Sequence, residues 1–140
     1  MNKIEIALEI ALSAHSGQVD KGGKPYILHP LRLMLQLEDE IDMISALLHD
    51  VLEDSHYTPD KLEELGIPEK AIEVISYLTR KKNETYEKFI KRAGSDRRAK
   101  QIKKLDIEDN MNISRIDNIT QKDLDRLNKY HAALKYLDSV

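Results

Sequence analysis

The chain has 140 residues, of which 41% are hydrophobic, so it can bury a core and is not a disordered chain. Its 22 Lys and Arg nearly balance 25 Asp and Glu, and the net charge of −3 argues against a protein that binds nucleic acid polymers. The absence of cysteine excludes disulfides, thiolate nucleophiles and cysteine-ligated zinc.

Helical periodicity runs through the chain, and no window alternates apolar and polar residues over the length of a strand. Residues 4–12 predict a first helix, and residues 17–25, rich in Gly and Lys, predict a loop. Pro30 fits the first turn of a second helix that extends to Leu37. Residues 41–52 predict a third helix, which is the most apolar and therefore the central one.

The second half of the chain continues the helical pattern. Further helices are expected at 58–66, 68–78, 83–94, 95–113 and 120–137. Thr58, Asn83 and Ser95 are the expected N-caps of three of them, and Pro59 fits the first helical position after Thr58. Because no linker or repeat interrupts the pattern, we expect residues 1–140 to form one all-α bundle of about seven or eight helices without a sheet.

Location and assembly follow from the same features. No apolar run approaches the roughly 20 residues that span a bilayer. Residues 1–12 carry two acidic side chains and no cleavage pattern, so they predict a mature helix and not a signal peptide. We expect a cytoplasmic protein without a membrane partner. The apolar stripe of residues 124–137 could pack internally or against a second copy, so the oligomeric state stays open, with a homodimer as one option.

The stretch LLHDVLED, residues 47–54, carries the clearest chemical pattern. His49 and Asp50 lie inside an apolar run and are followed within one turn by Glu53 and Asp54. Burying so many polar groups is costly unless something pairs with them, and a divalent metal is the simplest partner. Spacings of three and four residues place these groups on one side of a single helix.

Two distant segments could complete a metal site. His29 stands at a loop-to-helix junction, and Asp106 lies on a later helix with Asn110 one turn below it. Two imidazoles and two carboxylates make a mixed nitrogen and oxygen shell, which suits manganese, iron or zinc better than calcium. Each residue also has a plainer interpretation: His49 as a core histidine, or Asp106 as an ion-pair partner of Lys103.

Together these residues resemble the HD superfamily of metal-dependent phosphohydrolases. Residues 14–55 and 103–111 are similar to the hydrolase domain of the Rel/SpoT alarmone enzymes, and the likeness extends over residues 4–111. The resemblance is to the small, stand-alone alarmone hydrolases. It implies an HD-type helical fold and the removal of pyrophosphate from the 3′ position of ppGpp or pppGpp, which gives GDP or GTP.

The resemblance also implies a role for individual residues. The implied metal ligands are His29, His49, Asp50 and Asp106, with manganese as the usual ion. The implied catalytic pair, which handles the attacking water, is Glu53 and Asp54. The implied contacts to a nucleotide substrate are Lys21 and Asn110. Lys24, in the same loop, is a further expected contact, because both lysines can neutralise phosphates as point charges.

Two residues depart from the family pattern. Asp20 stands where the alarmone hydrolases have a basic residue that packs on the guanine base, and Asp109 stands where the long enzymes have His. These departures leave two alternatives open. The first is an HD-family nucleotidase or phosphodiesterase that acts on another nucleotide. The second is a nucleotide-binding module without turnover, which the intact Glu53 and Asp54 argue against.

Overall fold

The computed structural model describes residues 1–140 and confirms the all-α prediction. The helices are α1 (Lys3–Ala14), α2 (Leu28–Met34), α3 (Glu40–Leu47), α4 (Val51–Asp54), α5 (Pro59–Glu64), α6 (Glu69–Tyr77), α7 (Tyr86–Gly94), α8 (Arg97–Asn110), the 3₁₀ helix η1 (Ile113–Arg115) and α9 (Gln121–Ser139). A single antiparallel bridge between Val19 and Pro25 closes the loop between α1 and α2.

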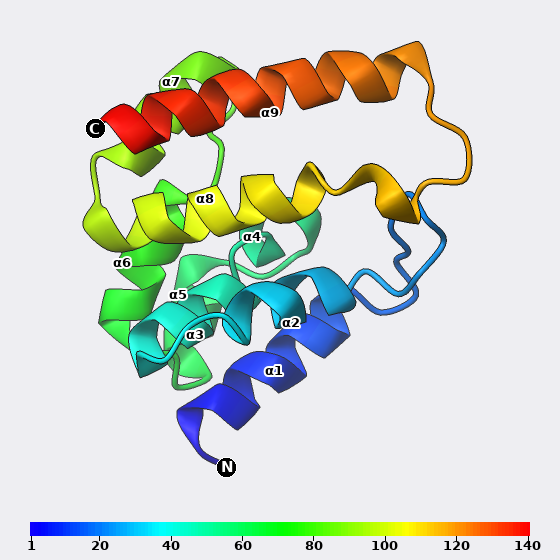
Figure 1. The fold of residues 1–140 in the computed structure, drawn as a ribbon. Coiled ribbons are helices and arrows are strands. Elements are labelled where there is room, and N and C mark those ends of the chain that lie inside the picture. Colours follow the sequence, from blue (N-terminus) through cyan, green and yellow to red (C-terminus); the bar gives the residue numbers. More distant parts are fainter.

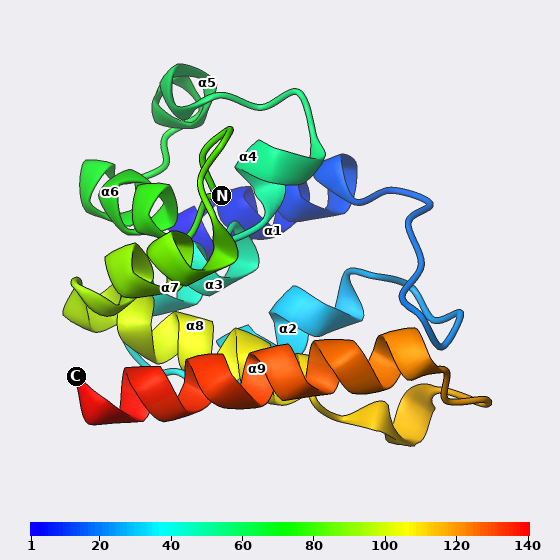
Figure 2. The same ribbon diagram turned by 90° about the horizontal axis from the view of Figure 1, so that it is seen from above.

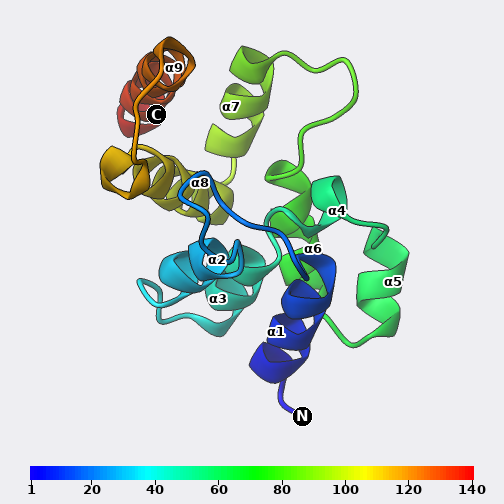
Figure 3. The same cartoon turned by 90° about the vertical axis from the view of Figure 1, so that its right-hand side faces the viewer.

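The helices pack around α3 and α8. Helix α3 contacts α1, α2, α6 and α8, and α8 in turn contacts α7 and α9. Figure 1 shows α8 between α9 on one side and the α1–α3 group on the other. Figure 2, seen from above, shows α9 in front of α8, and Figure 3 shows the same order from the side, with α5 and α6 on the right, away from α9.

Three clusters of buried apolar side chains hold this arrangement. The largest joins α1, α3, α5 and α6 and includes Leu47 and Ile75. The second lies between α2, α3, α6 and α8 and includes Leu33 and Ile102. The third fixes α7, α8 and α9 to one another and includes Leu137. Because α3 and α8 both take part in these clusters, the candidate residue Asp106 on α8 and the turn that follows α3 are held by well-packed elements.

The helix starts were predicted only in part. The Thr58 side chain accepts the N–H of Lys61, as an N-cap should. The predicted caps Asn83 and Ser95 are wrong. Asn83 has φ 68° and sits in a turn, and Ser95 closes α7 with helical dihedrals, whereas an N-cap is extended. The caps of α7 and α8 are Thr85 and Asp96, which have extended backbones and accept N–H groups three residues on.

The continuous central helix predicted over residues 41–52 is also wrong, because the chain turns between Leu47 and Val51. The physical reason is a side-chain hydrogen bond. His49 Nδ1 donates to the Ala46 carbonyl oxygen at 2.7 Å, and in a continuous helix that oxygen would accept the N–H of Asp50. His49 and Asp50 therefore lie in a turn between α3 and α4. Their facing atoms approach to 3.2 Å, although neighbours on a straight helix diverge by about 100°.

Helix α9 is buried along only part of its length. Ala133 and Leu137 are buried, whereas Leu124 is 42% exposed. The first half of α9 instead lies over η1 and the loop between α1 and α2 (Figures 1 and 2). No helix combines the length and the apolar character needed to cross a membrane.

Candidate metal centre and adjoining pocket

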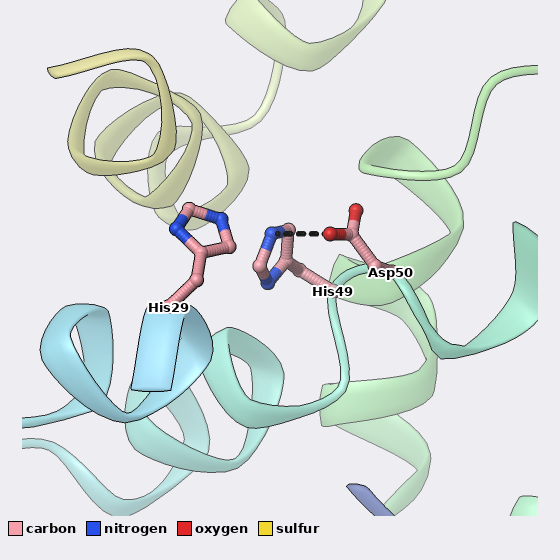
Figure 4. Close-up of side chains that lie close together, drawn as sticks. All are labelled: His29, His49 and Asp50. Atoms are coloured by element: carbon pink, nitrogen blue, oxygen red, sulfur yellow. Dashed lines mark ion pairs between the residues drawn. The ribbon is translucent and has the colours of Figure 1, made fainter. Parts of the chain in front are cut away.

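Residues from three separate elements converge on one buried point. His29 comes from α2, His49 and Asp50 from the α3–α4 turn, and Asp106 from α8. His49 Nε2 lies 3.2 Å from Asp50 Oδ2 and 3.4 Å from Asp106 Oδ1, and His29 Nε2 lies 2.8 Å from the same Asp106 oxygen. Ligand atoms of His29, His49 and Asp50 all lie within 4.8 Å of one another, and Figure 4 shows the two imidazoles and the Asp50 carboxylate side by side.

The donor set fits a divalent cation. Because His49 Nδ1 carries the hydrogen donated to Ala46, the lone pair of the neutral imidazole would lie on Nε2, which faces the cluster. That Nε2 is buried and has no partner in hydrogen-bonding geometry, which is costly for a polar atom. A cation held by His29, His49, Asp50 and Asp106 would satisfy it. Two imidazole nitrogens and two carboxylates suit a transition metal better than calcium.

The electrostatics of the cluster also favour a cation. Burial alone would lower the pKa of His49, but the neighbouring Asp50 and Asp106 carboxylates raise it well above its usual value. Burial would raise the pKa of Asp106, yet Lys103 and His49 hold it well below its usual range. Lys103 Nζ lies 2.8 Å from Asp106 Oδ2, and the Asn110 amide donates to Oδ1 at 3.1 Å. The Asp106 carboxylate therefore stays ionised and its orientation is fixed.

Asp109 supports the cluster from behind. Its Oδ2 accepts a hydrogen bond of 2.6 Å from His29 Nδ1, which directs His29 Nε2 toward Asp106. Arg32 holds the same carboxylate with Nε and Nη2 at 2.8 and 2.9 Å. In the sequence Asp109 stands out only as a departure from the family pattern, so this role was not predicted. The sequence did contain a signal for this role, namely a spacing of three residues that occurs twice. It separates His29 from Arg32 on α2, and Asp106 from Asp109 on α8.

Tyr26 is a second supporting residue that the sequence analysis missed. Its hydroxyl donates to Asp50 Oδ2. Burial first, and the Asp50 charge second, raise the pKa of Tyr26, so the phenol keeps its proton and remains a donor. Tyr26 therefore fixes one oxygen of Asp50 in the way that Asn110 fixes one oxygen of Asp106.

Glu53 and Asp54 lie on the short helix α4, directly after the turn, and both are exposed to solvent. Partial burial raises the pKa of Glu53, and the Asp50 charge adds to this, although a hydrogen bond from the Arg80 N–H acts in the opposite direction. Partial burial and Asp50 likewise raise the pKa of Asp54. Both carboxylates therefore hold a proton more readily than free side chains do, which is useful in a general base.

A pocket of about 250 Å³ adjoins this cluster. Its walls come from the loop between α1 and α2, the end of α8, η1 and the first half of α9. Tyr26 and Asn110 line the pocket, and they are also hydrogen-bond partners of Asp50 and Asp106. The pocket therefore adjoins the candidate metal cluster through these two side chains.

The predicted substrate contacts divide into two groups. Lys21 and Asn110 line the pocket, and Lys21 Nζ lies 3.4 Å from Asp123 Oδ1. Lys24 is exposed and does not line it. Arg126 and Tyr130 of α9 line the pocket but were missed, because the sequence analysis took this helix only as an apolar stripe. The available signal was a charged side chain four residues before a phenolic one that had been counted within that stripe.

The helical fold and the two-histidine, two-aspartate cluster define a class: this is a domain that resembles the HD-type hydrolase domain of the Rel/SpoT enzymes. No protein-family model matches the chain. The chain is 33% identical over 121 residues to the guanosine-3′,5′-bis(diphosphate) 3′-pyrophosphohydrolase of Aquifex aeolicus, which covers 78% of this chain and 17% of that protein. It is 47% identical over 60 residues to the protein of the same name from Haemophilus influenzae, which covers 39% of this chain and 9% of that protein.

A solved structure extends the likeness to nearly the whole chain. It is described as a metazoan ortholog of SpoT that hydrolyzes ppGpp, and the comparison gives a TM-score of 0.79 with 25% sequence identity. The match covers 98% of this chain and 84% of the other. The resemblance predicted from the sequence is thereby confirmed. The chain spans 17% or less of the length of the two pyrophosphohydrolases, so the activity of those larger proteins reaches it only as a proposal.

Proposed function

We propose that residues 1–140 form one HD-type phosphohydrolase domain, which uses a divalent metal to remove the 3′-pyrophosphate from ppGpp or pppGpp. The observation that carries this proposal is the buried, unpartnered Nε2 of His49, which lies among His29, Asp50 and Asp106 and beside a pocket. The names of the similar proteins support the choice of substrate.

The chemistry assigned to the site is hydrolysis at phosphorus. When bound, a divalent cation supplies Lewis acidity toward the phosphoryl oxygens and makes water more acidic. Water adds to the phosphorus next to the ribose, and the bond from that phosphorus to the 3′ oxygen breaks. The 3′ oxygen takes up a proton and becomes the 3′ hydroxyl of GDP or GTP, and the attacked phosphorus is released in pyrophosphate. Glu53 or Asp54 orients the water and accepts its proton, a role that their raised pKa values support.

The remaining roles follow from the same geometry. His29, His49, Asp50 and Asp106 are the proposed metal ligands. Their mixed nitrogen and oxygen donor set suits manganese, iron or zinc, and the family resemblance favours manganese among them. On the substrate side, Lys21 and Asn110 are the proposed contacts, since both line the pocket. Lys24 is exposed and does not line the pocket, so it would attract the phosphates only weakly, from outside the pocket.

The test is product identification with purified protein. With manganese, ppGpp should give GDP and pyrophosphate, and a chelator should stop the reaction. Asp50→Ala should abolish both hydrolysis and manganese binding. Asp138→Ala is the matched control, because Asp138 pairs with Lys104 on the outer surface and should leave activity unchanged. Release of orthophosphate alone, or full activity of the Asp50→Ala protein, would rule the proposal out.

A second candidate function, hydrolysis of another phosphorylated nucleotide, is favoured by one observation. Asp20 brings a carboxylate to the pocket wall at the position where the resembling enzymes carry a basic residue. An anion there changes which base is accepted without changing the metal cluster. A panel of guanine and adenine nucleotides, assayed with manganese, separates the two candidates by the ratio of kcat/KM values.

A further inference from the structure

Asp20 uses its two carboxylate oxygens differently. Oδ1 accepts the backbone N–H groups of Gly22 and Lys24 at 2.8 and 3.0 Å and so shapes the loop. Oδ2 is buried and has no hydrogen-bond partner, but it lies 3.9 Å from Nε of Arg115. The loop carboxylate therefore directs its free oxygen toward a guanidinium that comes from η1.

Arg115 is held by more than this one contact. Its Nη2 donates to the Asp109 carbonyl oxygen at 3.0 Å and lies 3.6 Å from Asp109 Oδ2. Its backbone is fixed as well, since a Cβ added at Gly22 would come within 2.5 Å of the Arg115 carbonyl oxygen. The loop between α1 and α2 therefore packs against η1 without room for a side chain at position 22. The Arg115 side chain is 26% exposed and lines the pocket.

We propose that Arg115 contacts the planar base of the bound nucleotide and supplies the cationic group that the family resemblance expects at position 20. The inference rests on the proposed function, because it takes a nucleotide as the occupant of the pocket. In this chain an acid at position 20 and an arginine on η1 replace a single basic residue in the loop.

The surroundings of Arg115 favour a base over a phosphate as its partner. Asp20 and Asp109 lie along the N–H edge of the guanidinium, so a phosphate there would meet two carboxylates. The planar faces of a guanidinium can instead stack on an aromatic ring, which needs no free N–H group. Lys21 and Arg126 remain on the same pocket as cations for the phosphates.

The test measures binding without turnover, with GDP and inorganic pyrophosphate as probes in separate calorimetric titrations of the full chain. Arg115→Lys keeps the charge but removes the planar face, so the Kd for GDP should rise about tenfold while the Kd for pyrophosphate stays within about twofold. Asp20→Asn keeps an oxygen for the loop amides but removes the charge that orients Arg115. Asp20→Asn should raise the Kd for GDP about threefold and leave the Kd for pyrophosphate unchanged.

Arg97→Lys, at an exposed position on α8, is the matched control and should change neither Kd. An equal rise in the Kd values for GDP and pyrophosphate in Arg115→Lys would identify Arg115 as a phosphate ligand and overturn the proposal. Unchanged GDP binding, or no GDP binding by the parent chain, would overturn it too. Because no hydrolysis is measured, a chain that binds GDP through Arg115 but leaves ppGpp intact would refute the proposed function alone.

Discussion

Asp109→Asn tests whether the carboxylate behind the cluster prepares the metal site. Asp109 accepts one hydrogen bond from His29 and two from Arg32. Burial alone would raise the pKa of Asp109, but these bonds lower it far below its usual range, so the group is an acceptor on both oxygens. An asparagine has one acceptor oxygen, and its amide would face either His29 Nδ1–H or an Arg32 N–H, donor against donor.

The size of the effect follows from that mismatch. Losing such a supporting partner weakens metal binding by about 10–100-fold. This corresponds to about 1.4–2.7 kcal/mol. Calorimetric titration of manganese into the parent and Asp109→Asn proteins measures it directly. Asp138→Asn, which changes a partly exposed ion pair with Lys104, is the control and should bind manganese as the parent does. A Kd for Asp109→Asn within twofold of the parent value would refute the reasoning.

Four further predictions concern the metal, the base, one ion pair and the core. Manganese at about 100 times its Kd should raise the free energy of unfolding of the parent protein by about 2.7 kcal/mol. An equal increase for the Asp50→Ala protein would show that the ion binds at another site. Glu53→Gln should lower kcat by about 10²-fold or more while the manganese Kd stays within about threefold; unchanged kcat excludes Glu53 as the base. Hydrogen bonds from Arg92 lower the pKa of Glu84 to about 2 from 4.5, so Glu84→Gln should cost about 1–2 kcal/mol at pH 7. The pKa of Glu84 is lower in the folded state than in the unfolded state, so the stability difference between the parent and Glu84→Gln proteins should persist above pH 4.5 and disappear as the pH falls toward 2. Urea titrations of both proteins at pH 7 and near pH 2 would measure it. Leu47→Ala, at a fully buried position, should cost about 2–5 kcal/mol, and a loss below 1 kcal/mol would mean that α3 is not central to the core.

Much of the fold could be predicted from the sequence, because apolar residues at helical spacing report directly on which face is buried. Thr58 was identified as a cap because capping depends on neighbours within one turn. The break after Leu47 could not be predicted from periodicity. It depends on His49 donating to a carbonyl of its own helix, and an apolar run on either side conceals that bond.

The candidate site was predicted where residue type alone indicates the chemistry. The sequence predicts that His29, His49, Asp50 and Asp106 form one donor set, and the structure brings these side chains together; their role as metal ligands stays a prediction. The supporting groups were missed because their roles depend on long-range contacts. Asp109 meets His29 across 80 residues of chain, and a hydrogen bond of that kind leaves no local periodicity.

The walls of the pocket were the hardest part to predict. Arg115 and Arg126 belong to segments that the sequence assigns to an irregular connection and an apolar helix, and neither segment contains a motif for ligand binding. They reach the pocket because η1 and the first half of α9 pack over the loop between α1 and α2. That packing is a property of the assembled bundle and not of either segment.

The most direct test of the central claim is anomalous diffraction at the manganese edge from crystals grown with the ion. We expect one peak within about 2.0–2.3 Å of His29 Nε2, His49 Nε2 and oxygens of Asp50 and Asp106. Full manganese occupancy at another place, with His49 Nε2 still unpaired, would contradict the account.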